Sequence, residues 1–430
     1  MNHPKSHKGH HVHPDDPDML SVEEAQKEIL SKIKVLEERK IPLIDSTDYV
    51  LAENIIANTN IPEFNNSAMD GFGVLSTDTS NATQENPAIL NIQETIPAGK
   101  IPKNKLLNGN SVRIMTGSAI PKGCDAVVPF EFTNLPKTHE KKVEIYKNAD
   151  YGENIRYIGE DIKKNNLVLE KGSIINSANI GLIASLGLES IKVYRKPMIS
   201  ILSTGDELVS PGENKKLGQI YDSNSYSIYS QVIQNGGIPH IRKIVPDNKD
   251  SLEAAFLDCS KSDLVITTAG VSKGDFDYIK DTIKKMGKIN FWSVRMRPGK
   301  PLTFGLLNYN KRQVPHIGLP GNPVSAIVGF EIFVSPVIKS MIGVKEIFRK
   351  QVTATLNDPI FNYDKRKVFA RVIVKGNPNQ GYSANITGDQ NSHILSSMSK
   401  ANGLAICPEN IKLLKKGDQV KVLMLNSEIL

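Results

Sequence analysis

The spacing of apolar residues changes several times along the chain, and each change predicts a different kind of structure. Ser21 and Glu24 have the spacing of a capping box, in which each side chain satisfies a free N–H group at a helix start. The apolar residues that follow recur on one helical face: Val22, Ala25, Ile29, Ile33 and Leu36. The pattern predicts a helix that begins near residue 22.

Between about residues 42 and 146 the apolar runs become short and are broken by Pro, Gly and Asn. Strand-like examples lie at 88–92, 111–115 and 142–145. Short strands at this spacing are typical of a small β module. Residues 150–190 return to a mixture of loop and helix and end in an apolar segment at 180–188.

Between about 196 and 342 strand-like and helix-like runs alternate. The expected strands are 198–202, 241–245, 263–268, 289–296 and 317–319, and the expected helices are 225–234, 252–259, 278–286 and a run from Val324. Continuous apolar strands separated by helices predict a parallel sheet that is covered on both faces. Beyond about 346 the runs are strand-like only: 352–356, 368–374, 404–407 and 420–425. The predicted fold class is therefore α/β plus β, in several domains.

The amino-acid composition excludes several classes of protein but does not identify a function. The 430 residues are 39% hydrophobic and 23% charged, which excludes disordered, collagen-like and disulfide-scaffold chains. No apolar run approaches the roughly 20 residues of a membrane span, and the polar N-terminus lacks a signal-peptide pattern. Cys124, Cys259 and Cys407 are far apart and form no metal-binding spacing, which suits a reducing cytoplasm.

The charge balance is weakly basic. Subtracting 46 acidic from 53 basic residues gives +7, with the lysines scattered along the chain. Nucleic-acid binders usually concentrate such charge on one face together with stacking aromatics, so a solvated surface is the favoured interpretation. A small polyanionic ligand would also use a few of these cations. Residues 1–18 carry five histidines, and a disordered leader is favoured there over a metal-binding tract.

Candidate chemistry gathers in four loops that follow predicted strands. In an open parallel sheet, ligands bind outside the carboxyl ends of strands, where loops meet helix N-termini. Loop 203–208 carries hydroxyls, a glycine and two carboxylates, and loop 269–277 combines phosphate-binding glycines with cation-binding aspartates. In loop 297–301 two cationic side chains flank a stiff Pro-Gly turn, which directs them to one place. Loop 318–325 leads into the start of a helix. Any one of them is also ordinary turn sequence, but four successive loops converge on one edge.

The motifs that these loops lack reduce the support for several common functions. None is a Walker A loop or a dinucleotide-binding glycine fingerprint, and no serine-hydrolase elbow is present. In the β module, Asp70 follows Ala68-Met69, where a carboxylate needs a partner, but Asp70-Gly71 is also a turn sequence. Both interpretations of Asp70 stay open. The segment at 113–118 and the acids at 160–161 are further, weaker candidates.

Taken together, eight segments resemble the molybdopterin molybdenumtransferase family, which acts last in molybdenum cofactor synthesis and is related to the gephyrin E domain. In chain order they are SAMDGFGV (67–74), RIMTGSAIPKGCDAVVPFE (113–131), IRYIGEDI (155–162), STGDEL (203–208), GQIYDSN (218–224), GVSKGDFDY (270–278), MRPGKPLTFG (296–305) and GLPGNPVSA (318–326). Eight motifs in family order are far more specific than any single loop.

The resemblance implies an elongated homodimer, in which the β insertion of one subunit faces the α/β loops of the other. The four implied parts are a helical linker and dimerisation domain (19–45 and 147–195), a β insertion (46–146), an α/β molybdopterin-binding domain (196–345) and a C-terminal β domain (346–430). The disordered leader expected at 1–18 has no counterpart in the family. It also implies a reaction. Adenylylated molybdopterin and molybdate are the substrates, Mg²⁺ assists hydrolysis of the adenylate, and molybdenum enters the dithiolene.

Position by position, the resemblance implies three groups of site residues. The catalytic group is Asp70, Thr116, Asp161, Glu207 and Asp277. The magnesium ligands are Asp247 and Asp277. The substrate-binding group is Ser272, Arg297, Lys300, Pro320, Pro323, Ser325, Arg371 and Ser392. The sequence departs from the family pattern at Ala269 (usually Gly), Arg297 (usually Lys, so that contacts become bidentate) and Phe72 (usually Tyr).

Two alternative functions remain open at this point. A molybdopterin adenylyltransferase would share the α/β fold but would need neither the β insertion nor the β tail. A gephyrin-like scaffold would have no need of Asp70, Glu207 and Asp277 together. The leading hypothesis is a cytoplasmic molybdenumtransferase with small anionic substrates, with the adenylyltransferase as a candidate partner and with neither nucleic acid nor membrane.

Overall fold

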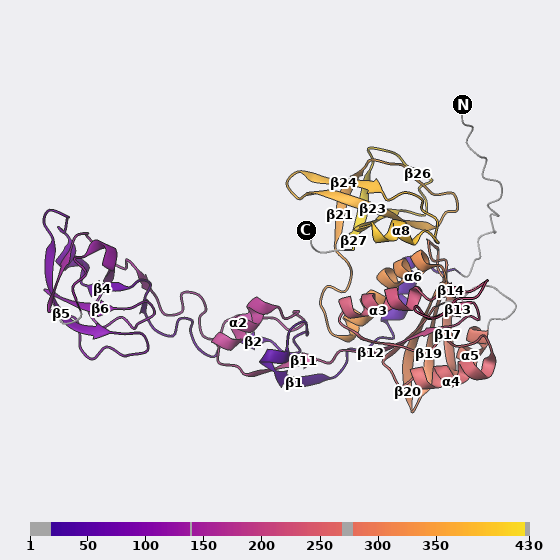
Figure 1. The fold of residues 1–430 in the computed structure, drawn as a ribbon, viewed down its shortest axis with the longest axis horizontal. Helices are drawn as coiled ribbons and strands as arrows, with labels where there is room; N and C mark the ends of the chain where they lie inside the picture. Colours follow the sequence, from indigo (N-terminus) through magenta and orange to yellow (C-terminus); the bar gives the residue numbers. More distant parts are fainter. Residues whose placement is uncertain (1–18, 138–139, 269–277, 426–430) are drawn as a thin grey trace.

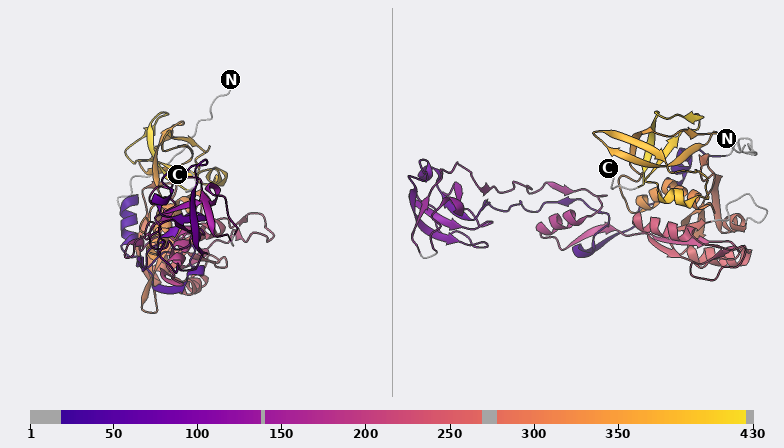
Figure 2. Two further views of the ribbon diagram at one scale, coloured as in Figure 1. Left: turned by 90° about the vertical axis from the view of Figure 1, so that its left-hand side faces the viewer. Right: turned by 45° about the horizontal axis from the view of Figure 1, so that its top comes forward.

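The computed structural model describes residues 19–137, 140–268 and 278–425, and shows an elongated molecule. A β arm lies at one end, a narrow linker follows, and an α/β body with a second β domain forms the other end (Figures 1 and 2). The fold class predicted from the apolar pattern, α/β plus β, is confirmed.

The arm is a five-stranded sheet in the order β7-β4-β6-β5-β8. Its strands are β4 (Gly71–Val74), β5 (Ala88–Ile96), β6 (Asn110–Ile114), β7 (Ala126–Pro129) and β8 (Lys142–Ile145). Strand β4 lies between β6 and β7 and is buried throughout. A side chain at Gly71 would lie 2.1 Å from the carbonyl oxygen of Val128, so only glycine allows β7 to approach this closely.

The linker is less helical than the resemblance implied. Within the described residues it holds the helix α2 (Ser177–Ser185), the 3₁₀ helix η1 (Leu43–Asp45) and short antiparallel strand pairs joined by loops. These pairs are β1 (Glu38–Pro42) with β11 (Ser190–Tyr194), β2 (Ile55–Ile56) with β10 (Leu167–Leu169), and β3 (Asn66–Ser67) with β9 (Ile155–Arg156). Their β-branched residues favour strands.

The helix expected from the capping box is present as α1 (Val22–Leu30), with both reciprocal hydrogen bonds formed. It does not belong to the linker. Its buried residues Val22, Ala25 and Ile29 share a core cluster with the α/β body, because the apolar face fits there. Residues 22–30 of the predicted linker segment 19–45 therefore pack on the α/β body.

The α/β body contains a six-stranded sheet in the order β15-β12-β16-β20-β19-β17. The strands are β12 (Met198–Ser203), β15 (Ile238–Ile241), β16 (Leu264–Thr268), β17 (Gly287–Ser293), β19 (Pro301–Tyr309) and β20 (Arg312–Leu319). Pairings within β15-β12-β16-β20 are parallel, and β19 is antiparallel to both of its neighbours. Because β19 is antiparallel to both β20 and β17, strands β17 and β20 run in the same direction.

Three details of this sheet differ from the sequence predictions. The strand expected at 241–245 lies at 238–241, and the one expected at 289–296 ends at Ser293. Strand β19 was not predicted, and it makes the sheet mixed instead of wholly parallel. A tight turn at Asn310 and Lys311, both with positive φ, joins β19 to β20 as a hairpin.

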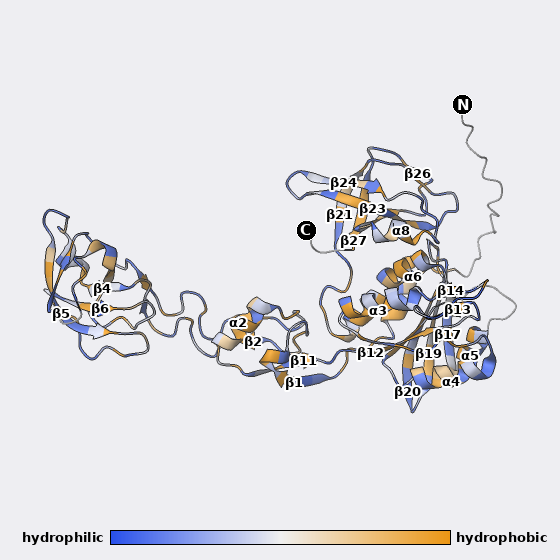
Figure 3. Cartoon of the chain, in the orientation of Figure 1, coloured by the Kyte–Doolittle hydropathy of each residue, from blue (hydrophilic) through white to orange (hydrophobic). Residues whose placement is uncertain are grey.

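Helices cover the sheet and bury its apolar strands, whose colouring marks the core in Figure 3. They are α3 (Asn224–Gln234), α4 (Lys249–Cys259), α5 (Tyr278–Met286), α6 (Pro323–Gly329) and α7 (Ser335–Met341), with a π-helical segment η4 (Phe330–Val334) between the last two. Contrary to the sequence expectation, Pro323–Met341 is long and apolar enough to span a membrane by length and composition. However, 83% of its apolar window is buried, as in a core helix.

The C-terminal domain is a sheet in the order β18-β23-β24-β21-β27-β25, closed by pairing of β25 with β23. Its strands are β21 (Gln351–Leu356), β23 (Lys367–Asn377), β24 (Gly381–Ile386), β25 (Gly403–Cys407) and β27 (Gln419–Met424). The short pair β22 (Ile360–Phe361) and β26 (Leu413–Leu414) and the helix α8 (Leu395–Ser399) flank it. Strand β18 (Met296–Arg297) comes from the α/β body, so one predicted anion-binding loop joins the two domains.

Candidate active site

The carboxyl ends of β15, β12, β16, β20 and β17 open onto one edge of the α/β sheet. After β12 the chain moves to β15 on one side, and it then returns to β16 on the other side of β12. Loops that leave neighbouring strands in opposite directions create a crevice there, which is the usual ligand site of open α/β sheets. Most of the predicted site residues follow these strands.

Acidic residues gather at the β12 and β15 end of this edge. Glu207 follows β12, and its carboxylate lies so close to Gly205 that a Cβ there would be 2.6 Å from Oε2. Asp247 follows β15, and its backbone N–H donates to the Asp206 carboxylate at 3.3 Å. The structure therefore brings together the predicted residues Glu207 and Asp247 and adds Asp206, which belonged to no predicted site.

The acidic cluster affects the titration of Asp247. Burial, followed by the negative charges of Asp206 and Glu207, raises the pKa of its carboxyl, and the Thr204 hydroxyl acts in the opposite direction. Thr204 is 1% exposed, and its side-chain oxygen makes no hydrogen bond of standard geometry within the described part of the chain. Carboxylates that repel one another beside an unpaired hydroxyl form an oxygen donor set that suits a hard divalent cation.

This donor set is incomplete by itself. Among the residues that the structure describes, no three His, Cys, Asp or Glu side chains gather closely enough to hold a metal ion. Asp277, the second predicted magnesium ligand, lies outside the described residues, as does Ser272. The chemistry of the residues present fits Mg²⁺ in kind, with Asp247 and Thr204 as the nearest donors.

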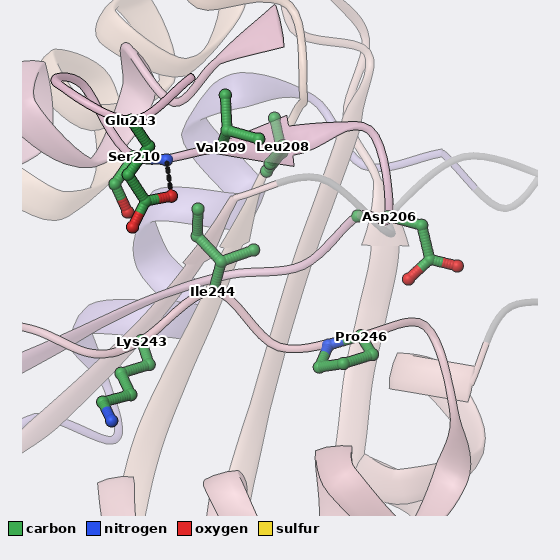
Figure 4. Close-up of a pocket in the computed structure, with 9 residues that line it drawn as sticks. Asp206, Leu208, Val209, Ser210, Glu213, Lys243, Ile244 and Pro246 are labelled. Carbon is green, nitrogen blue, oxygen red and sulfur yellow. Dashed lines mark hydrogen bonds between the residues drawn. The ribbon is translucent and has the colours of Figure 1, made fainter. Parts of the chain in front are cut away.

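A pocket of about 630 Å³ is lined by Asp206, one of these acids, and Figure 4 shows the residues around it. Asp206 lies at its rim, and Glu213 accepts the backbone N–H of Ser210 at 3.4 Å. The strands β13 (Leu208–Val209) and β14 (Ile220–Tyr221) support one wall, and Lys243 lines the other side. The pocket is large enough to admit part of a nucleotide-sized ligand.

Cations lie at the β17 end of the same edge. The strand order places four spacings between β12 and β17, which corresponds to roughly 19 Å. Arg297 lines a separate cavity of about 300 Å³ at the junction with the C-terminal domain, and Lys300 is half-buried in the same loop. An elongated anionic ligand is therefore needed to contact both ends at once.

The remaining substrate-binding predictions lie around this junction. Pro320 and Pro323 flank the end of β20, Ser325 is buried at the start of α6, and the Ser392 carbonyl accepts the Val324 N–H at 3.2 Å. Arg371 is wholly buried and does not line the cavity; burial lowers its pKa to about 10. Its Nε donates to Ser397 at 2.8 Å, a contact that sequence reasoning missed because only the fold brings α8 against β23.

The other predicted catalytic residues belong to the arm and its connection. The Asp70 carboxylate accepts the Thr116 backbone N–H at 2.6 Å and the Thr116 hydroxyl at 2.8 Å. These two hydrogen bonds lower the pKa of Asp70. Asp161 is exposed where the arm joins the linker, and its backbone N–H donates to Ile61. Asp70 directly precedes β4 and Thr116 follows β6, and within one chain these strands lie at the far end of the molecule from β12 (Figure 1).

The fold and the site define a multidomain protein whose α/β domain gathers carboxylates and cations along one sheet edge. Three family profiles cover most of the chain: "MoeA N-terminal region (domain I and II)" at 20–187, "Probable molybdopterin binding domain" at 200–340 and "MoeA C-terminal region (domain IV)" at 353–425. The chain belongs to the MoeA family of molybdopterin molybdenumtransferases, as the eight segments predicted.

Named relatives and solved structures agree with this assignment. The molybdopterin molybdenumtransferase of Haemophilus influenzae is 33% identical over 94% of this chain and 98% of its own length. The Bacillus subtilis protein of the same name is 32% identical over 95% of both chains. A crystal structure of the molybdopterin biosynthesis MoeA protein from Pyrococcus horikosii superposes with a TM-score of 0.79 at 28% identity, covering 95% of this chain and all of that one.

Proposed function

We propose that this chain is a molybdopterin molybdenumtransferase that hydrolyses adenylylated molybdopterin and inserts molybdate into its dithiolene. The observation that carries the proposal is the arrangement of one sheet edge, with carboxylates Asp206, Glu207 and Asp247 at one end and cations Arg297 and Lys300 at the other. A substrate that contains phosphates, together with an oxyanion, requires both kinds of group.

In the hydrolysis step, Asp247 and Thr204, with Asp277, would hold Mg²⁺. When bound, the cation supplies charge that stabilises the phosphate oxygens during P–O cleavage. Arg297, Lys300 and Ser325 would orient the anionic groups. In the insertion step, Glu207 and Asp70 would move protons from the dithiolene thiols to the molybdate oxygens that leave as water. Asp161 would contribute from the base of the arm, and Arg371 and Ser392 would support the anion end.

The arm residues can act at this edge only if a second subunit contributes them. We therefore infer a homodimer in which Asp70 and Thr116 of one chain reach the α/β loops of the partner. Exposed apolar side chains support a subunit interface. They lie on the linker and on one face of α3: Ile44, Ile56, Leu167, Ile174, Tyr226, Tyr229 and Ile233.

The cysteines and the adenylylated substrate support a cellular location and a partner enzyme. All three cysteines are free and buried, which suits a reducing cytoplasm. An adenylylated pterin must come from an enzyme that transfers adenylate to it, so the molybdopterin adenylyltransferase is the expected partner.

The proposal is tested by incubating the full chain with adenylylated molybdopterin, Mg²⁺ and molybdate. We expect AMP release and formation of active cofactor. Asp247→Asn should reduce AMP release at least about tenfold, whereas Glu207→Gln should release AMP but yield little cofactor. Asp281→Asn, an exposed carboxylate on α5, is the matched control and should change neither.

Two outcomes would overturn the proposal. Binding of the adenylate without any turnover by the unmodified protein would favour a scaffold. Net adenylylation of molybdopterin from ATP, without insertion, would favour an adenylyltransferase.

A further inference from the structure

The Arg297 side chain is held by the C-terminal domain. Its strand β18 pairs in parallel with β23, with Met296 opposite Lys367 and Arg297 opposite Val368. The Nη2 group donates to the carbonyl oxygen of Phe361 at 2.5 Å, and Nη1 lies 3.7 Å from Oδ2 of Asp364. The second distance is that of an ion pair without a hydrogen bond, so most of the guanidinium donors of Arg297 are uncommitted.

Asp364 is shared between two guanidinium groups. The same Oδ2 atom forms a close ion pair with Arg366. Burial by itself raises the pKa of the Asp364 carboxyl. The hydrogen bond from Arg366 and the charges of Arg366 and Arg297 outweigh burial, so the pKa is lowered overall. The other oxygen, Oδ1, is buried and has no hydrogen-bond partner in the described residues. Asp364 is thus an ionised carboxylate with only one of its two oxygens satisfied.

The cavity beside Arg297 has the charge of an anion site. Its walls include Pro298, Gln390 and Asn391, and the exposed ring of Tyr363 lies at one side. Asp389 also lines it, but its carboxylate accepts both N–H groups of Asn391. Behind the wall, Arg371 has a buried Nη1 group that makes no hydrogen bond to any residue that the structure describes. Arg297, Arg366 and the buried Arg371 carry three positive charges against the two negative charges of Asp364 and Asp389, which leaves one positive charge for an incoming anion.

We propose that Asp364 is an internal counter-ion that a tetrahedral dianion displaces from Arg297. This inference rests on the proposed function, in which the dianion is molybdate. A guanidinium exchanges one carboxylate oxygen at 3.7 Å for two close contacts to an oxyanion, which is the stronger arrangement. Asp364 remains on Arg366 after the exchange. The carboxylate therefore sets how tightly the anion is held and how readily it leaves.

The test is calorimetric titration of the full chain with molybdate at fixed ionic strength, without adenylylated substrate. Asp364→Asn should tighten molybdate binding at least about fivefold, because no counter-ion has to be displaced. Glu409→Gln is the matched control. It removes a carboxylate 3.5 Å from Arg295 at the same junction, and it should leave the affinity unchanged.

A second variant protects the test against misfolding of the first. Arg366→Gln should weaken molybdate binding, because Asp364 then pairs with Arg297 alone. Unchanged or weaker binding by Asp364→Asn, or tighter binding by Arg366→Gln, would overturn the proposal. Since the titration needs no turnover, failure of the proposed function would appear separately, as absence of AMP release.

Discussion

Asp70 and Glu207 are single acids whose surroundings prepare them for different tasks. Asp70 is an exposed carboxylate that two hydrogen bonds from Thr116 keep ionised. The Glu207 carboxylate lies where a side chain on Gly205 would be, and the glycine, with a φ of +145°, leaves room for it. In both cases a residue beside the carboxylate in space has a physical role.

Gly205 provides a prediction at this scale. Gly205→Ala places a methyl group 2.6 Å from Glu207 Oε2, so the carboxylate must move. We expect cofactor formation to fall at least about tenfold, since an ångström-scale displacement of a reacting group is costly. Gly212→Ala is the control, because Gly212 also has positive φ (94°) but nothing within 4 Å of the added atom. Equal losses in the two variants would show that backbone strain, and not Glu207, is responsible.

At the scale of elements, β20 is a core strand that carries a buried polar residue. His316 lies in its middle, is wholly buried and packs 5.5 Å from the Phe256 ring of α4. Its Nε2 lies 3.0 Å from the Thr267 hydroxyl of β16, while Nδ1 has no partner in the described residues. Burial lowers the pKa of His316 to about 3.

The buried histidine makes stability depend on pH. Between pH 6.5 and about 3 the unfolded chain binds a proton at His316 that the folded chain does not, so stability falls as the pH decreases through this window. At pH 5 the loss is about 2 kcal/mol. His316→Gln should flatten the decline of the urea midpoint between pH 7.5 and 5. His240→Gln, which alters an exposed histidine on β15, should leave the decline unchanged. An equally steep decline in His316→Gln would contradict the assignment.

At the scale of the whole molecule, the elongated shape separates the catalytic predictions into two groups. Asp70 and Thr116 are on the arm, whereas Glu207 and Asp247 are on the body (Figures 1 and 2). Under the proposed homodimer, each active site therefore takes residues from two chains.

Mixing of inactive variants tests this arrangement. When Asp70→Asn and Glu207→Gln subunits are mixed and allowed to exchange, half of the dimers are mixed and each carries one intact site. We expect roughly a quarter of the unmodified activity. A mixture of Glu207→Gln and Asp247→Asn subunits, both altered on the body, should remain inactive. Absence of recovery in the first mixture, despite exchange shown by mass spectrometry, would contradict the shared site.

Much of the local structure followed from the sequence alone. The capping box at Ser21 and Glu24 predicted α1, and apolar runs predicted most strands of the α/β sheet, because both depend on neighbouring residues. The linker strands and β19 were missed, since short segments form strands only when a partner lies beside them. The resemblance named the acids, but their arrangement could not be deduced from their order.

The sequence by itself determined the family, the fold class and the types of residue that carry charge. Only the tertiary structure decided which of them meet, because strand order, not chain order, sets distance. It placed Asp206 with Asp247, tied Arg297 to Asp364 in another domain, and buried Arg371 behind the cavity. It also separated Asp70 from Glu207 along an extended molecule, and from this separation we infer the need for a second subunit.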